Sequence, residues 1–212
     1  MKTIREGRVC NVHFAIKGKE IRTKMSNFIE FLEDHLGEIQ YGWNHDEKGE
    51  KMPFQIVKFA GGPFPGTSTY TTLGLSHEPL ICPLEGKEMY QELVFVAPTE
   101  FGDQNIPGIM IQVGREMLRK REVLLRGEVI GPAGKLFTET DLEALYVTVP
   151  VYFEESFHIY HRDNNRSIIM SWLIPITKKE ALFIDDNDWE DFEDLLEAKD
   201  PDLTDFERNS MV

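Results

Sequence analysis

Ser76 and His77 stand side by side near the end of an alternating stretch at residues 69–80, and serine with histidine is a pairing that nucleophilic catalysis uses. A hydrolase nucleophile elbow needs Gly-x-Ser-x-Gly between a strand and a helix, whereas His77, Glu78 and Pro79 follow this serine. Neighbouring side chains of a strand point to opposite faces, so the two groups would not readily bond each other. We therefore expect a strand that ends in a turn.

His158 and His161 have the H-x-x-H spacing that can hold a metal ion on a helix. We expect a strand or loop here, where this spacing places the two rings on opposite sides, and no third ligand follows nearby. Two surface histidines are the simpler interpretation. A hydrolase or metal-dependent enzyme built around His158 and His161 stays open as an alternative.

The glycine-rich segment at residues 60–66, AGGPFPG, could be taken for a phosphate cradle. It lacks the Lys-Ser/Thr pair of a P-loop, and its two prolines carry no amide proton to bind phosphate. We expect no helix directly after it. The segment is therefore predicted to be a turn.

Carboxylates dominate the C-terminal part of the chain. Residues 181–212 contain twelve acids and two bases, a net charge of −10 out of −14 for all 212 residues. Such a run is often just a solvated face, but it can also steer a basic partner or bind a metal ion. The candidate partner-binding residues are Asp185, Asp186, Asp188, Glu190, Asp191 and Asp194.

Composition and charge exclude several classes of protein. An excess of 37 acids over 23 bases argues against direct binding to a nucleic-acid backbone. No apolar run approaches the roughly 18 residues of a membrane helix, and the N-terminus has no signal-peptide core. Cys10 and Cys82 match neither a disulfide framework nor a zinc pattern, so we expect reduced thiols in a cytoplasmic protein, with no cofactor and no metal.

Hydrophobic periodicity predicts the elements that position these residues. Apolar steps of three and four indicate helices at residues 21–36 and 106–125, and a third helix that begins among the aspartates at 185–188 and carries Trp189 and Phe192 on its inner face. Strands are expected at 53–60, 68–76, 90–98, 144–153 and 166–176, with a loop or frayed edge at 39–53.

This order of elements is not the strict alternation of a doubly wound parallel sheet. We expect an α+β fold with a mixed, mostly antiparallel sheet flanked by helices. The chain 1–212 is predicted to be one domain, with a core at about 21–199 and a C-terminal tail at about 200–212 that frays.

Three separated segments carry a resemblance to a known family. They are TYTTLGLS at 69–76, ELVFVAP at 92–98 and WLIPITKKEALFI at 172–184. Together, and in this order, they resemble the bacterial suppressor-of-fused domain family over roughly residues 21–199. The most specific segment combines Pro175, suited to a strand's end or edge, with Thr177 and Glu180, spaced as a helix capping box.

The resemblance implies a non-catalytic protein-interaction domain, because bacterial members are similar to immunity proteins and antitoxins. It implies a protein partner, such as a basic toxin domain of the nuclease type, neutralised by stoichiometric occlusion. The family's animal relative holds an extended peptide by strand addition, so a general peptide-binding regulatory module that uses a sheet edge is the alternative. The resemblance assigns no catalytic residues, and the oligomeric state is left open.

Overall fold

The structure is a computed structural model that describes residues 19–46, 48–162 and 166–212, with side chains from residue 27 onward. Five helices are described: α1 (Lys19–Leu36), α2 (Ile106–Lys120), α3 (Glu155–His158), α4 (Lys178–Asp186) and α5 (Trp189–Lys199). The strands are β1 (Ile39–His45), β2 (Lys51–Phe59), β3 (Thr67–Leu73), β4 (Leu80–Ile81), β5 (Glu88–Pro98), β6 (Val129–Ile130), β7 (Leu142–Thr148), β8 (Ile159–Arg162) and β9 (Arg166–Thr177). Two short 3-10 helices, η1 (Leu75–His77) and η2 (Thr99–Phe101), follow β3 and β5.

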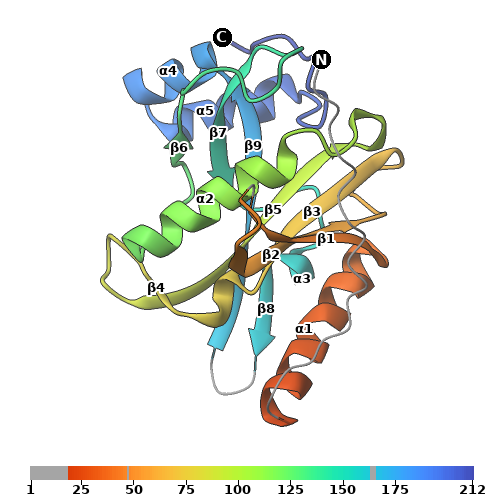
Figure 1. Cartoon of the computed structure of the whole chain (residues 1–212). Coiled ribbons are helices and arrows are strands. Elements are labelled where there is room, and N and C mark those ends of the chain that lie inside the picture. Colours follow the sequence, from red (N-terminus) through yellow and green to blue (C-terminus); the bar gives the residue numbers. More distant parts are fainter. Residues whose placement is uncertain (1–18, 47, 163–165) are drawn as a thin grey trace.

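Within the described ranges, all nine strands belong to one mixed sheet (Figure 1). Its main order is β1-β2-β3-β5-β9-β7-β6, while β4 pairs with β5 and β8 pairs with β9. The β5–β9 pair is parallel and every other pair is antiparallel. The predicted α+β class with a mostly antiparallel sheet is therefore confirmed.

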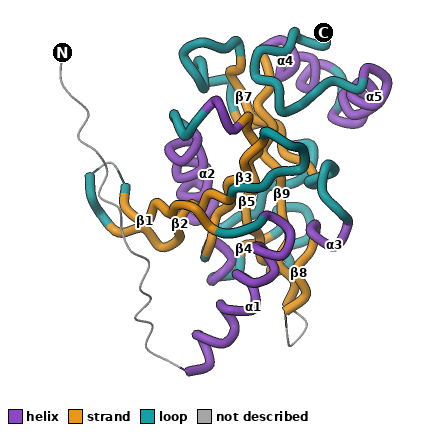
Figure 2. Tube along the Cα trace, turned by 90° about the vertical axis from the view of Figure 1, so that its right-hand side faces the viewer, coloured by secondary structure: helices purple, strands orange, loops and turns teal. Residues whose placement is uncertain are grey.

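Helices cover both faces of this sheet, and each face has its own apolar core. One core contains buried residues of α1, α4 and α5, and the other contains the buried residues of α2. Figure 2 shows α2 on one side of the strands and α3, α4 and α5 on the other. The central strand β9 is buried on both faces from Met170 to Thr177, which explains its nearly continuous apolar sequence.

The predicted turn at 60–66 is present, and it connects β2 to β3 beside the end of α1. The Gly61 amide donates to the Leu36 carbonyl over 3.0 Å. A Cβ atom on Gly61 would lie 2.6 Å from the Leu36 carbonyl oxygen, so only glycine allows this approach.

The segment predicted as a loop or a frayed edge at 39–53 contains the edge strand β1 and the first residues of β2. The loop alternative is wrong, because an edge strand is half exposed and its sequence lacks the clean alternation that would have revealed it. Trp43 nevertheless packs against Tyr70 of β3, with 6.3 Å between the ring centroids.

The helix predicted at 106–125 ends earlier, at Lys120. Arg121 adopts the left-handed conformation (φ 60°) and ends α2. The chain then runs beside β4, where the Ile81 amide donates to the Arg121 carbonyl and the Val123 amide donates to the Ile81 carbonyl. Val123 is buried, but it lies in this extended segment and not on the apolar face of a helix. The strand predicted at 144–153 likewise stops at Thr148, before Pro150, which has no amide proton for a ladder.

The prediction that residues 200–212 fray is wrong. Leu203, Phe206 and Met211 are buried in the two cores, so the tail passes from one sheet face to the other. Phe206 stacks on Phe137 with 5.3 Å between the centroids. The residues against which the tail packs lie far from it in the sequence, so local composition did not reveal that the tail is buried.

Candidate partner-binding surface

Helix α4 starts where the sequence predicts, at a capping box. The Thr177 side chain accepts from the Glu180 amide over 3.2 Å, and the Glu180 carboxylate accepts from the Thr177 amide over 2.8 Å. These reciprocal bonds satisfy two amide groups at the helix start. They fix the direction in which α4 leaves the sheet.

Glu180 also holds the C-terminal tail. Its carboxylate is fully buried and accepts two bonds from the Arg208 guanidinium, at 2.6 and 3.0 Å, and one from the Met211 amide at 3.1 Å. The Arg208 side chain is only 6% exposed. The tail is therefore fastened to the start of α4 by a buried, bidentate ion pair.

Glu193 fixes α5 to the sheet in a similar way. Its carboxylate accepts from the Arg126 guanidinium, from the Tyr146 hydroxyl at 2.8 Å and from the Thr148 hydroxyl at 3.1 Å. Arg126 also lies over the Trp189 ring, with 5.2 Å from the guanidinium carbon to the centroid. Glu193 is thus a structural residue within an otherwise exposed acidic helix.

A fall in pH is expected to weaken both sets of contacts, those of Glu180 with the tail and those of Glu193 with the sheet. Burial raises the pKa of Glu180, but the Arg208 guanidinium and backbone donors outweigh it and hold the pKa below the usual 4.5. Burial likewise raises the pKa of Glu193, and Arg126 with Tyr146 reverses the shift. Both folded values are depressed, so the stabilisation is complete above the unfolded pKa of 4.5 and is lost as pH falls through the folded values.

The measurement is urea unfolding of the wild type and of Glu180→Gln from about pH 7 to about pH 3. The variant should be less stable at neutral pH and should lose less stability on acidification, because its amide does not titrate. Parallel pH profiles for the two proteins would contradict this assignment.

The six predicted partner-binding acids are all exposed, and they cluster around the corner between α4 and α5. Asp185 and Asp186 end α4, whereas Glu190, Asp191 and Asp194 lie on α5. Asp188 also has a structural role, because its carboxylate accepts from the Trp189 amide over 2.6 Å and caps α5. We call these six residues the acidic surface. Its role in binding stays a prediction.

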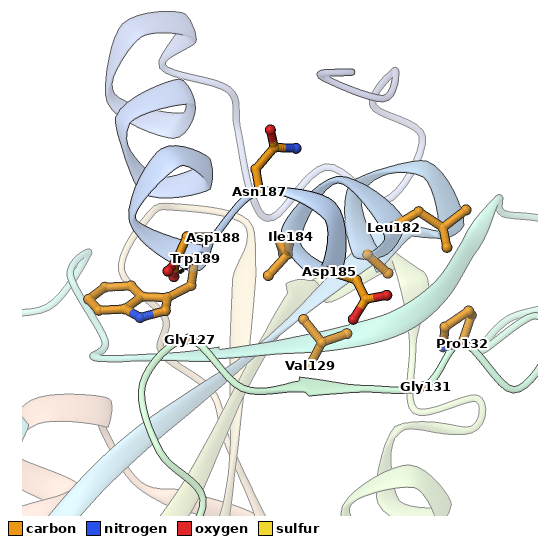
Figure 3. Close-up of a pocket in the computed structure, with 11 residues that line it drawn as sticks. Gly127, Val129, Gly131, Pro132, Leu182, Ile184, Asp185, Asn187, Asp188 and Trp189 are labelled. Atoms are coloured by element: carbon orange, nitrogen blue, oxygen red, sulfur yellow. Dashed lines mark hydrogen bonds between the residues drawn. The ribbon is translucent and has the colours of Figure 1, made fainter.

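A groove of about 560 Å³ opens beside the acidic surface, between β6 and the α4–α5 corner (Figure 3). We call it the α4–β6 groove. Trp189 lies at one end, Leu182 and Pro132 lie at the other, and the Asp185 carboxylate points from α4 towards Val129 on β6. The groove thus combines apolar side chains, such as Val129 and Leu182, with exposed polar groups, and its mouth is acidic. Sequence reasoning missed it because β6 and α4 lie about fifty residues apart.

The side chains of Ser76 and His77 have different surroundings. The buried Glu92 carboxylate accepts from the Ser76 hydroxyl at 2.6 Å and from the amides of Ser76 and Gly74 at 3.0 Å each. The His77 ring packs over Gly74, whose φ of 101° suits glycine. The predicted strand followed by a turn is confirmed, and Glu92 clamps this turn.

The second Glu92 oxygen is buried without a hydrogen-bond partner among the described residues. Glu92 is also one of the residues that line a cavity of about 20 Å³, together with His77 and Arg162. That volume is large enough for one water molecule.

His158 and His161 have separate local partners. His158 Nε2 lies 3.2 Å from the Pro150 carbonyl, and His161 Nδ1 lies 3.1 Å from the Ser167 hydroxyl. In the described ranges, no three His, Cys, Asp or Glu side chains gather closely enough to hold a metal ion. The same ranges contain a free, buried thiol at Cys82, whereas Cys10 lies outside them. None of the described helices is both long and apolar enough to cross a membrane.

Comparison with known proteins identifies relatives of this chain. The family model described as Suppressor of fused protein (SUFU) matches residues 50–209. Among curated proteins, Immunity protein YqcF of Bacillus subtilis (strain 168) is 23% identical over 169 residues, which cover 78% of this chain and 85% of that protein.

Solved structures share the fold. A suppressor of fused homologue from Neisseria gonorrhoeae FA 1090 aligns with a TM-score of 0.69 at 18% identity, covering 90% of this chain and 96% of the other. The Sufu-Fu complex gives a TM-score of 0.63 at 14% identity, covering 89% and 92%. Drosophila Suppressor of Fused gives 0.61 at 14% identity over 88% of this chain, which spans only 50% of that longer protein.

Proposed function

The chain belongs to the suppressor of fused protein family, and from this membership we propose that it is a non-catalytic protein-binding module. The observation that carries the proposal is the pairing of this family membership with the similarity to Immunity protein YqcF. The sites that could have suggested catalysis also have structural partners: Ser76 donates to Glu92, and His158 and His161 contact separate neighbours.

The finer proposal is an immunity protein or antitoxin that acts in the cytoplasm and neutralises a partner toxin by stoichiometric occlusion. The acidic surface supports a basic partner, such as a nuclease toxin domain, because a concentrated negative field attracts cationic surfaces. Glu193 and Glu180 fasten α5 and α4 to the sheet, so this surface is presented on a rigid base.

A second candidate is a general peptide-binding module that uses a sheet edge. Strand β1 is a terminal strand of the described sheet, and its Tyr41 side chain is 56% exposed. An exposed aromatic residue beside backbone groups that no other described strand pairs favours the addition of an extended peptide. Deletion of this aromatic side chain in Tyr41→Ala would weaken binding in this case and would leave occlusion by the acidic surface unchanged.

Charge reversal on the acidic surface is expected to slow association. The test variant carries Glu190→Lys, Asp191→Lys and Asp194→Lys, and it spares Asp188 because that residue caps α5. With a basic toxin domain encoded beside this chain as the partner, the association rate should fall at least about tenfold at low salt, and the difference should shrink as salt screens the field. Stopped-flow mixing measures both effects.

The matched control reverses Glu30, Asp34 and Glu38, which are exposed on or just after α1. Helix α1 lies at the opposite end of the molecule from α4 and α5 (Figure 1). The control makes the same change in net charge, so it should slow association much less. Equal rates for both variants and the wild type would refute steering by the acidic surface, and absence of any complex would refute the proposed function.

A further inference from the structure

The end of α4 carries charges that do not serve the stability of the helix. Asp185 and Asp186 lie in its last turn, which contains no basic residue. Helix C-termini carry partial negative charge, so carboxylates are unfavourable there. Neither aspartate has an ion pair within the described ranges. A local arrangement that costs stability is the kind of feature that marks a functional site.

The same helix end borders the α4–β6 groove. Asp185 points into the groove across from Val129, between the Trp189 ring and the Leu182 side chain (Figure 3). Leu182 is 47% exposed, and Trp189 is only partly buried. A carboxylate, a helix C-terminus and several apolar side chains therefore meet in one open groove of about 560 Å³.

We propose that the α4–β6 groove receives a long basic side chain, arginine or lysine, from a partner protein. The aliphatic stem of that residue packs between Val129 and Leu182, and its charged head pairs with the Asp185 carboxylate at the negative end of α4. This inference rests on the proposed function, and it places the central contact of the complex in the groove, with the rest of the acidic surface as its rim.

Charge and shape together select this occupant. A phosphate-bearing partner would be repelled by Asp185 and Asp188, which both line the groove. A hydrated metal ion would gain nothing from apolar walls and would require more oxygen ligands. A basic side chain uses both the apolar walls and the carboxylate, and burial of the contact excludes water from the ion pair.

The test is a titration with acetyl-Leu-Arg-Leu-amide, using acetyl-Leu-Gln-Leu-amide as the neutral control. The readout is the indole N–H signal of Trp189 in nitrogen-15 NMR, which is assigned by its loss in Trp189→Phe. We expect a saturable shift at concentrations up to about 10 mM with the arginine peptide, and at least a fivefold weaker response with the glutamine peptide.

Two single variants distinguish a specific contact with Asp185 in the groove from a general effect of negative charge. Asp185→Asn should weaken binding of the arginine peptide at least about fivefold, whereas Glu197→Gln, which removes the same charge from an exposed α5 residue outside both the groove lining and the acidic surface, should change the affinity less than about twofold. Both sites are exposed, so both variants should fold. Leu182→Lys supplies a competing cation at the rim and should abolish the shift.

Absence of a saturable Trp189 shift, or equal weakening by Asp185→Asn and Glu197→Gln, would overturn the groove site. A protein partner whose affinity is unchanged by Asp185→Asn would also overturn it, while leaving the proposed function intact. An intact peptide response in a chain that binds no protein would support the groove chemistry and count against the proposed function.

Discussion

Replacement of Arg208 by methionine is expected to lower the free energy of unfolding by about 3 to 5 kcal/mol. Methionine keeps most of the aliphatic volume but removes the guanidinium that pairs with Glu180. Because Glu180 is fully buried, the substitution leaves a carboxylate charge without its main partner in a site that water does not reach. Urea unfolding followed by circular dichroism measures the loss.

Arg119→Met is the matched control. Arg119 also pairs with a glutamate, Glu116, but both side chains are largely exposed. Exposed pairs contribute at most about 1 kcal/mol, so the control should stay close to the wild type. The double variant Glu180→Gln with Arg208→Met should recover part of the loss, because no charge is then left buried.

The effect on the tail supplies an independent readout. The Met211 amide donates to Glu180, so its hydrogen exchange should accelerate in Arg208→Met. A variant as stable as the control, with a slowly exchanging Met211 amide, would show that the tail is held by its apolar residues alone, namely Leu203, Phe206 and Met211.

Features that depend on nearby residues were predictable from the sequence. The capping box of Thr177 and Glu180 needs only a spacing of three, and the structure contains both of its bonds. Strand β9 was predictable because twelve largely apolar residues leave few alternatives. The turn after β3 followed from the turn preferences of its residues, since Gly74 adopts a positive φ there.

Features that depend on distant contacts were not predictable in this way. The tail looks polar, and its burial requires a pairing between Glu180 and Arg208 that no local pattern indicates. Strand β1 exists because β2 offers it a partner. The end of α2 depends on hydrogen bonds to β4, about forty residues earlier in the chain.

The candidate site was predictable only in part. The acidic surface follows from a count of charges. That count does not show that Glu193, in the same helix, is instead a structural residue. Helical spacing contains that signal, because Glu193 lies four residues after Trp189 and three before Leu196, on the same side of α5. Its contact with Tyr146 and the α4–β6 groove both require the tertiary fold.

Replacement of Glu92 by leucine is expected to cost about 3 kcal/mol or more. The Glu92 carboxylate accepts from three donors on Gly74 and Ser76, and each buried donor left without an acceptor costs about 1 to 3 kcal/mol. Leucine has a similar size but no acceptor, so the turn after β3 would lose its clamp. Thermal and urea unfolding measure the change.

Two smaller changes at the same clamp test whether its role is structural. Glu92→Gln keeps one acceptor oxygen and should lose clearly less stability than Glu92→Leu. Ser76→Ala removes one of the three donors, so it should cost about 1 to 2 kcal/mol and leave partner binding unchanged. Loss of binding or of any turnover in Ser76→Ala, with stability intact, would restore a chemical role to the serine. Full stability of Glu92→Leu would instead show that the backbone of the turn, with Gly74 at a φ of 101°, holds its shape without the carboxylate.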